Sequence, residues 1–263
     1  MPAPILELRG LVKSFGGVKA VSALDMTVNE GEIHALIGPN GSGKTTTLNV
    51  ISGLYRANEG SVRFRGDEIS QLPPHTIAQR GITRTFQNIR LFPRLTVLDN
   101  VMIGRHTRLR TNFWMALTPN PITLAEEDEA RRRAHELLAF VGLADRARIR
   151  ASSLAYGDQR RLEIARALAA EPALLLLDEP AAGMNPTETD ALVKLLYDVR
   201  DRGITLLLIE HDMNLVMSIS NRITVLNFGT HIAEGAAADI AQNPDVITAY
   251  LGGPLDSGFA ETR

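Results

Sequence analysis

The nine residues 38–46, GPNGSGKTT, constrain the fold of this chain more than any other segment. They fit the pattern G-x-x-x-x-G-K-[ST], which binds phosphate where it joins a strand to a helix. The apolar run IHALI precedes them, and KTTTLNVISGL repeats apolar residues at helical spacing after the glycines. The sequence therefore predicts a strand, a glycine-rich loop and a helix in succession, within an α/β fold.

The residue types in this loop match the chemistry of phosphate binding. Its glycines let backbone N–H groups close around phosphate oxygens, and the positive end of the helix dipole adds to the attraction. The pattern assigns Lys44 to the β- and γ-phosphates and the hydroxyl of Thr45 to Mg²⁺. A glycine-rich turn without a ligand is the structural alternative. The nucleotide contacts expected from this loop are Gly38, Pro39, Asn40, Gly41, Ser42, Gly43, Lys44, Thr45 and Thr46.

A second apolar run ends in two adjacent carboxylates, Asp178 and Glu179, within LLLLDEPAAG. Adjacent acids at the end of a core strand repel each other, so a nearby cation or a role in proton transfer is expected. We interpret Asp178 as a Mg²⁺ ligand and Glu179 as the general base for a water that attacks the γ-phosphate. The alternative is an Asp-Glu pair that only caps a helix after a core strand.

The rest of the chain predicts an α/β core interrupted by helices. The pattern is β-like at the start, helical from about Thr96 to Ala170, and mixed again after Glu171. Residues 125–143 predict a helix with acids in its first turn and Gly142 near its end. Later segments predict a strand at 173–178, a helix at 187–202, a strand at 204–210 and a hairpin at 222–235 turning at Gly229-Thr230.

Composition excludes several classes of function. The chain has 263 residues, no cysteine and a net charge of −2. Disulfides, thiol catalysis and cysteine metal sites are therefore absent, and no basic field exists to hold nucleic acid. No apolar run approaches the ~18 residues of a membrane span, and the first residues lack a signal-peptide pattern. The sequence predicts a soluble, cytoplasmic protein that does not bind nucleic acid.

A third motif, LAYGDQRRLEIARAL at 154–168, lies just ahead of the acid pair. The order of phosphate loop, glutamine, this signature motif, acidic strand and histidine resembles the ATP-binding-cassette (ABC) ATPases from about residue 5 to 251. Segments such as RTFQNIRLFPRLTVLDNV, LLIEHDMNLVMSISNRI and NPDVITAYLG are most similar to the ATPase subunits of branched-chain amino acid importers. The resemblance implies ATP and Mg²⁺ as cofactors.

The resemblance also implies a fold and a domain plan. The fold is an α/β P-loop NTPase (RecA-like) core with an antiparallel β subdomain and an inserted α-helical subdomain. One ABC ATPase domain would span 1–253, with its nucleotide-binding core at 1–90 and 171–253 and its helical signature subdomain at about 91–170. Residues 254–263 would form a tail.

Three further residues gain roles from the resemblance. It implies that Phe15 stacks on adenine, that Gln87 touches Mg²⁺ and the attacking water, and that His211 contacts the γ-phosphate. Read alone, these residues would be a core phenylalanine, a surface glutamine and a hydrogen-bonded polar histidine. The expected catalytic residues are Lys44, Gln87, Glu179 and His211, and the expected metal ligands are Thr45, Gln87 and Asp178.

The signature motif departs from the commonest form of the superfamily. Ala155 replaces a serine, Tyr156 replaces a glycine, and Asp158 replaces a glutamine. The anion-binding elements that remain are the backbone N–H groups near Gly157 and the start of the following helix. Tyr156 and Gly157 are therefore expected nucleotide contacts. Asn185 stands where the loop after the acidic strand often has aspartate and meets the other subunit.

Partners follow from the resemblance alone. It implies a head-to-tail dimer with a second ATPase subunit, attachment to transmembrane permease subunits at the cytoplasmic face of the membrane, and an indirect link to a periplasmic substrate-binding protein. Another transport system, such as lipopolysaccharide or amphiphile export, and a soluble ABC ATPase are the alternatives. A small-molecule kinase would share the phosphate loop but not the signature.

The segment 104–124 contains the single tryptophan, Trp114, among basic residues. It predicts either a surface excursion between two helices or a contact between Trp114 and the membrane subunits.

Overall fold

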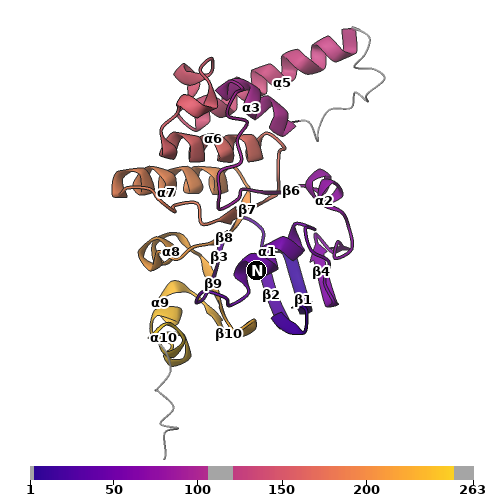
Figure 1. Cartoon of the computed structure of the whole chain (residues 1–263), viewed down its shortest axis with the longest axis vertical. Helices are drawn as coiled ribbons and strands as arrows, with labels where there is room; N and C mark the ends of the chain where they lie inside the picture. Colours follow the sequence, from indigo (N-terminus) through magenta and orange to yellow (C-terminus); the bar gives the residue numbers. More distant parts are fainter. Residues whose placement is uncertain (1–2, 106–120, 252–263) are drawn as a thin grey trace, which may run out of the picture.

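The computed structural model describes residues 3–105 and 121–251, with side chains placed for 125–250 in the second range. Two sheets and a group of helices make up the described chain (Figure 1). Trp114 lies outside the described residues, so its contact with membrane subunits stays a prediction.

A six-stranded sheet forms the centre, in the order β10-β9-β3-β8-β7-β6. The five neighbouring strands β9, β3, β8, β7 and β6 run parallel to one another. Strand β10, at the edge of the sheet, pairs antiparallel with β9. Strands β3, β7 and β8 are buried along their whole length, as their continuous apolar runs predict. The strands are β3 (Ile33–Ile37), β6 (Ile82–Arg84), β7 (Leu174–Asp178), β8 (Thr205–Ile209), β9 (Arg222–Asn227) and β10 (Thr230–Gly235).

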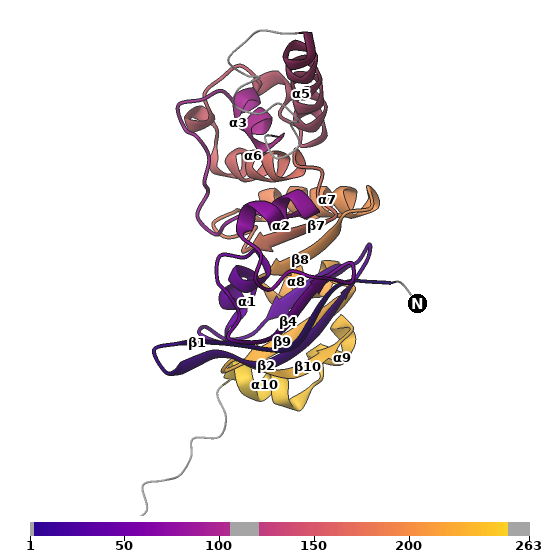
Figure 2. The same ribbon diagram turned by 90° about the vertical axis from the view of Figure 1, so that its right-hand side faces the viewer.

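A second, antiparallel sheet has the order β2-β1-β4-β5. It lies beside the lower half of the central sheet and α1 in Figure 2. The predicted antiparallel β subdomain is confirmed. The strands are β1 (Pro4–Phe15), β2 (Val18–Asn29), β4 (Glu59–Phe64) and β5 (Asp67–Glu68).

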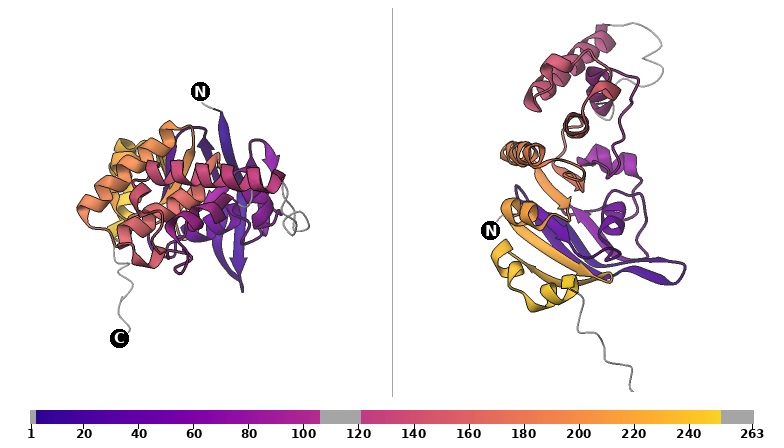
Figure 3. Two further views of the ribbon diagram at one scale, coloured as in Figure 1. Left: turned by 90° about the horizontal axis from the view of Figure 1, so that it is seen from above. Right: turned by 60° about the vertical axis from the view of Figure 1, so that its left-hand side comes forward.

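Helices α3, α5 and α6 group at one end of the molecule, and α9 and α10 lie at the other end (Figures 1 and 2). Figure 3 shows the same separation from a third direction. The predicted helical insertion is thus confirmed. The helices are α1 (Lys44–Ile51), α2 (Pro74–Arg80), α3 (Val97–Gly104), α5 (Pro121–Phe140), α6 (Tyr156–Leu168), α7 (Pro186–Asp201), α8 (Met213–Ile219), α9 (Ala237–Ala241) and α10 (Pro244–Leu251), with short 3₁₀ turns η2 (Ala144–Arg146) and η3 (Ala151–Ser153).

Two apolar cores cover the two faces of the central sheet. Leu174 and Leu176 of β7 pack in the core that includes β1, β2 and α1. Leu175 and Leu177 pack in the core that includes α3, α6, α7 and α8. Because successive side chains of a strand point to opposite faces, one run of leucines supplies both cores.

Two sequence predictions about boundaries are wrong. Helix α5 begins at Pro121, so it has no acidic residue in its first turn. Its acids instead pair along the helix with later arginines, as Glu127 does with Arg131 four positions on. The hairpin turns at Phe228 and Gly229, one residue earlier than predicted, with φ of 46° and 79°. A two-residue turn with both φ values positive matches the twist of paired strands.

No helix in the described part of the chain is both long and apolar enough to cross a membrane.

Candidate functional site

The loop between β3 and α1 has no room for side chains at two of its glycines. A Cβ on Gly38, whose φ is 149°, would lie 2.0 Å from the carbonyl oxygen of Leu226 in β9. A Cβ on Gly43, whose φ is 99°, would lie 2.3 Å from the carbonyl oxygen of Ala20 in β2. Two neighbouring backbones thus hold the loop closely, which only glycine permits. The predicted strand, loop and helix are all present.

Lys44 folds back over this loop. Its Nζ donates to the carbonyl oxygens of Gly38 at 2.7 Å and Pro39 at 2.9 Å. Burial lowers the pKa of Lys44, while the nearby charges of Glu179 and Asp178 act in the opposite direction. Lys44 is therefore a buried cation that feels both members of the acid pair.

The other residues of the loop divide by exposure. Ser42 and Gly43 are buried, and Pro39 and Thr46 are half-buried. The exposed residues are Asn40, Gly41 and Thr45. The open side of the loop thus carries the threonine hydroxyl predicted to bind Mg²⁺.

Three predicted catalytic residues meet at the carboxyl edge of the parallel sheet. Gln87 follows β6, Glu179 follows β7 and His211 follows β8. Gln87 Nε2 donates to Glu179 Oε2 at 2.8 Å, and His211 Nε2 lies 2.6 Å from Glu179 Oε1. Glu179 has a φ of 49°, an uncommon backbone conformation for a residue with a side chain. Both oxygens of the carboxylate are therefore held, and its backbone is strained.

Asp178 has a partner that the sequence did not reveal. Arg84, at the end of β6, donates from Nη2 to Asp178 Oδ2 at 2.6 Å. Nη1 of the same arginine donates to Asn49 Oδ1 at 2.6 Å. The repulsion expected between the two neighbouring acids is thus offset by a buried guanidinium next to Asp178.

Glu210 is a second residue that sequence reasoning missed. Its Oε1 accepts from the backbone N–H of Ala181 at 2.8 Å, and its Oε2 accepts from that of His211 at 3.0 Å. Burial raises its pKa above the ordinary value, against the effect of these hydrogen bonds. Glu210 thus ties the chain after the acid pair to the chain at His211. The sequence feature that could have identified Glu210 was its position directly before His211.

The start of the signature motif packs on the same chain's segment after the acid pair. A Cβ on Gly183 would lie 3.3 Å from the ring of Tyr156, and one on Gly157 would lie 2.7 Å from Oε1 of Glu188. Tyr156 itself remains 43% exposed. Helix α6, which begins at Tyr156, belongs to the helical group, and Figures 1 and 2 show it apart from α1. The structure does not bring the signature to the phosphate loop of its own chain.

Two residues that differ from the usual pattern of the superfamily, Asp158 in the signature motif and Asn185 after the acidic strand, have structural roles. Asp158 is buried and pairs with Arg146 and Arg161 inside the helical group. Asn185 caps α7, since its side chain accepts from Glu188 N while Glu188 accepts from Asn185 N.

Phe15 is at the end of β1 and is 43% exposed. Its ring meets that of Tyr55 edge to face at 5.1 Å between centroids, and Lys13 Nζ lies 5.0 Å from the Phe15 centroid. Tyr55 was not predicted, because nothing in its sequence context distinguishes it from other surface aromatics.

The residues present fit Mg²⁺. In the described part of the chain, no cluster of three or more His, Cys, Asp or Glu residues could hold a metal. The oxygen donors predicted for Mg²⁺ are the Thr45 hydroxyl, the Asp178 carboxylate and the Gln87 amide, whose nitrogen donates a hydrogen bond to Glu179. One carboxylate supplemented by hydroxyl and phosphate oxygens is the kind of site Mg²⁺ prefers.

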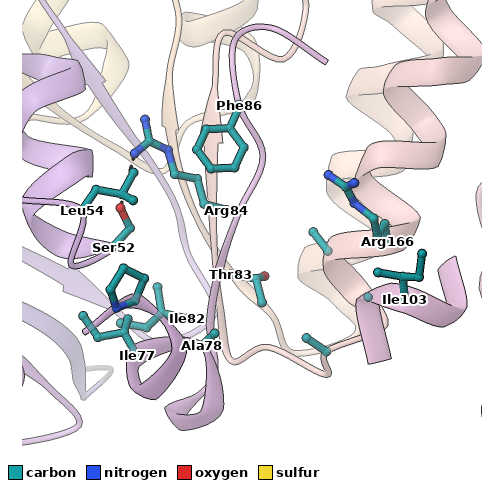
Figure 4. A pocket seen from close by; sticks show the side chains of 14 residues that line it. Ser52, Leu54, Ile77, Ala78, Ile82, Thr83, Arg84, Phe86, Ile103 and Arg166 are labelled. Carbon is teal, nitrogen blue, oxygen red and sulfur yellow. Dashed lines mark hydrogen bonds between the residues drawn. The ribbon is translucent and has the colours of Figure 1, made fainter. Parts of the chain in front are cut away.

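A cavity of about 320 Å³ lies beside the segment that leads to Gln87 (Figure 4). Strand β6 and helix α2 form one wall, and α3 and α6 contribute the other. Its lining is mostly apolar and includes Ile77, Ala78, Ile82, Phe86, Ile103 and Arg166.

Known proteins resemble this chain in sequence and in fold. A family model described as ABC transporter matches residues 21–182, and one described as branched-chain amino acid ATP-binding cassette transporter matches residues 230–256. The high-affinity branched-chain amino acid transport ATP-binding protein BraF of Pseudomonas aeruginosa is 48% identical over 253 residues, 96% of this chain and 99% of BraF. The lipopolysaccharide export system ATP-binding protein LptB of Haemophilus influenzae is 37% identical over 248 residues, 94% of this chain and 97% of LptB.

Solved structures show the same similarity. An ATP-binding cassette of an ABC transporter in its ADP conformation has a TM-score of 0.84 and 33% identity, covering 95% of this chain and 99% of the other. A dimeric cassette in a post-hydrolysis state, bound to ADP and Pi, has a TM-score of 0.74 and 28% identity, covering 88% and 98%.

Proposed function

This chain belongs to the ABC transporter family of ATPases, and we propose that it is the ATP-hydrolysing, energy-coupling subunit of an importer for branched-chain or related amino acids. The observation that carries the catalytic part is the Glu179 carboxylate, which Gln87 and His211 hold at the same sheet edge as the phosphate loop. The cargo part rests on the likeness to BraF and on the match at residues 230–256.

ATP binding begins at the phosphate loop. The β- and γ-phosphate oxygens replace the carbonyls of Gly38 and Pro39 as acceptors for Lys44, giving stronger, charge-assisted hydrogen bonds. The N–H groups of residues 38–46 surround the phosphates. Phe15, exposed beside Tyr55, stacks on the adenine ring.

Glu179 acts as the general base. Its carboxylate takes a proton from the water that attacks the γ-phosphorus in line with the departing ADP. Gln87 orients the carboxylate and that water, and His211 donates a hydrogen bond to a γ-phosphate oxygen. The two contacts on Glu179 support this assignment, because a base held at both oxygens loses little orientational freedom on reaction.

Thr45, Asp178 and Gln87 would hold Mg²⁺ through oxygen atoms. The bound ion would neutralise charge on the β- and γ-phosphates. Its coordination by Asp178 requires the carboxylate to be shared with, or released by, Arg84.

A second ATPase subunit completes the site. Helix α6, which begins at Tyr156 and Gly157, belongs to the helical group and lies apart from α1, the helix that follows the phosphate loop, in Figures 1 and 2. A head-to-tail partner would supply its signature to each loop, so that two ATP molecules lie between two subunits. The partner is a second copy of this chain or a related ATPase. The similarity to a dimeric cassette supports this arrangement.

The apolar cavity beside Gln87 is the surface we assign to the permease subunits. It adjoins both the helical group and the sheet, and Phe86 in its wall directly precedes Gln87. A docked permease element would therefore sense movement of the catalytic glutamine. Attachment in this way would hold the chain peripherally at the cytoplasmic face of the membrane, with a periplasmic substrate-binding protein acting only through the permease.

Lipopolysaccharide export remains a second candidate because LptB shares 37% of its residues with this chain. The identity to BraF is higher, at 48%. The amino-acid importer is therefore the preferred function, and a soluble ABC ATPase is disfavoured by both relatives.

The proposal is tested in liposomes that contain the chain with its permease subunits and binding protein. Leucine or a related amino acid should stimulate phosphate release and enter the liposomes. Lys44→Ala should abolish both and weaken nucleotide binding, because the lost ammonium faces the β/γ-phosphate charge. Lys194→Ala, which removes an exposed lysine of α7, is the control and should behave as wild type. Stimulation by an amphiphile alone would favour export, and full activity in Lys44→Ala would contradict the site.

A further inference from the structure

Arg84 is a nearly buried cation whose role is not given by the proposed mechanism. Its side chain is 5% exposed and that of Asp178 is 4% exposed. Besides Asp178, the guanidinium donates to Asn49 Oδ1 at 2.6 Å and to Ser52 Oγ at 3.3 Å. Its Nε is buried without a hydrogen-bond partner. Arg84 thus neutralises Asp178 at the cost of one unsatisfied donor.

Two cations compete for the same carboxylate. Oδ2 of Asp178 accepts from Arg84, and Asp178 is also the proposed Mg²⁺ ligand. A guanidinium and a divalent ion on one buried carboxylate repel each other strongly at low effective dielectric. Tight binding of either one must therefore weaken the hold of the other.

The guanidinium is also part of the wall of the apolar cavity. Arg84 and Phe86 both line it, and the carbon at the centre of the guanidinium lies 5.1 Å from the centroid of the Phe86 ring (Figure 4). The backbone carbonyls of Phe86 and Gln87 are held by Arg160, at 2.8 Å each. The Phe86 ring thus lies beside the Arg84 guanidinium, while the backbone that carries it is held by Arg160.

We propose that Arg84 is a resident counter-cation of Asp178 that Mg²⁺ displaces when it arrives with nucleotide, and that this exchange moves the cavity wall at Phe86. The inference rests on the proposed function, since it needs Asp178 as a metal ligand. It adds a residue that links the metal site to the cavity assigned to the permease. Arg84 is a positioning residue in this account and touches neither nucleotide nor water.

If the Arg84–Asp178 ion pair were purely structural, removal of Arg84 would change the metal affinity in the opposite direction. If Arg84 only supported Asp178, its loss would loosen the site and weaken metal binding. If Arg84 competes, its loss leaves Asp178 with its full negative charge and tightens metal binding.

The experiment measures the affinity for Mn²⁺, as a paramagnetic substitute for Mg²⁺, by electron paramagnetic resonance in the presence of saturating ADP. Arg84→Gln should bind Mn²⁺ about fivefold or more tightly than wild type, the lower end of usual couplings between two sites. Arg84→Lys keeps the positive charge but cannot donate from two nitrogens at once, so its Mn²⁺ affinity should lie between those of wild type and Arg84→Gln. Arg80→Gln removes a positive charge from α2, where Arg80 pairs with the exposed Asp67, and should match wild type.

Unchanged or weaker Mn²⁺ binding in a folded Arg84→Gln would overturn the competition. If the wild-type protein bound ADP but took up no Mn²⁺ at saturating ADP, the metal site itself would be overturned, and with it this inference.

A second measurement uses the unaltered protein, in case Arg84→Gln does not fold. The side-chain nitrogen NMR signals of Arg84, identified by their absence in Arg84→Lys, report rotation of the guanidinium. Adding Mg²⁺ to the ADP-bound protein should speed that rotation, because Asp178 releases Nη2. Rotation that stays slow when Mg²⁺ is bound would overturn the exchange.

Discussion

The imidazole Nε2 of His211 lies 2.6 Å from Oε1 of Glu179, and Gln87 holds the other oxygen of the same carboxylate at 2.8 Å. The three residues come from the ends of three adjacent parallel strands, β8, β7 and β6. Open α/β sheets bind ligands at this edge. The carboxylate is thus oriented by the sheet itself, and its chemistry can be tested with little disturbance of the fold.

Glu179→Gln should bind ATP normally and hydrolyse it about 10²–10⁴-fold more slowly, because the amide keeps the shape but cannot accept the proton. Phosphate release and a fluorescent-nucleotide titration measure the two effects separately. Glu234→Gln changes an acid of β10 that pairs with Arg222, and should leave hydrolysis intact. Hydrolysis near the wild-type rate in Glu179→Gln would remove this residue as the base.

The head-to-tail dimer is best tested at Ala155. Ala155 is the exposed N-cap of α6 and makes no side-chain cap. Serine and aspartate are both good N-caps, so either should preserve the helix. In the Glu179→Gln background, Ala155→Asp should prevent the MgATP-dependent dimer, since in the proposed head-to-tail arrangement its carboxylate would face the partner's γ-phosphate, whereas Ala155→Ser should retain it.

Size-exclusion chromatography with MgATP distinguishes the two variants, with a related ATPase subunit added if the chain alone stays monomeric. Equal dimerisation of both would contradict the sandwich. Gly157→Asp is a poorer test, because a Cβ there would lie 2.7 Å from Oε1 of Glu188 and disturb the start of α7.

Gly38→Ala should destabilise the protein by about 1–3 kcal/mol or more, because its Cβ would lie 2.0 Å from a backbone oxygen of β9. Gly41→Ala has nothing within 4 Å of the added Cβ but has a φ of 79°, so about 1 kcal/mol of backbone strain is expected. Thermal unfolding followed by circular dichroism compares the two. Equal losses would show that the close approach of β9 does not constrain the loop.

Glu210 should make stability depend on pH. Burial raises its pKa above 4.5, so the folded protein holds this proton more tightly than the unfolded chain does. The free energy of unfolding should therefore fall as pH rises from 4.5 through the raised folded value. Glu210→Gln lacks this titration, so wild type should lose stability relative to the variant over that interval. A difference in melting temperature that is constant with pH would contradict the assignment.

The sequence predicted those parts of the fold whose signals are local. The runs at 33–37, 173–178 and 204–210 match β3, β7 and β8 to within one residue at each end, because strands buried on both faces are apolar throughout. The phosphate loop was equally clear, since its glycines, lysine and threonine are contiguous. The start of α5 was missed because acids can support a helix from within it as well as at its first turn.

The rest of the site depends on contacts that no local pattern encodes. Arg84 and Asp178 are 94 residues apart and meet only because β6 and β7 are neighbours in the sheet. Glu210 and Ala181 are 29 residues apart, and their hydrogen bond joins two loops. Strand order decides such pairs, and the apolar patterns of the strands do not specify strand order.

The four consecutive leucines of β7 point alternately to the two faces of the central sheet, and this affects how the register of the strand is set. If the strand slipped so that Leu177 took the position of Asp178, three of the four leucine positions would still hold leucine, with Ala173 in the fourth. Apolar packing alone therefore distinguishes the two alignments weakly. The groups that do so are Asp178, through Arg84, and Glu179, through Gln87 and His211. The two acids therefore also help to set the alignment of β7 in the sheet, so a chain with apolar residues at both positions would risk mispaired strands.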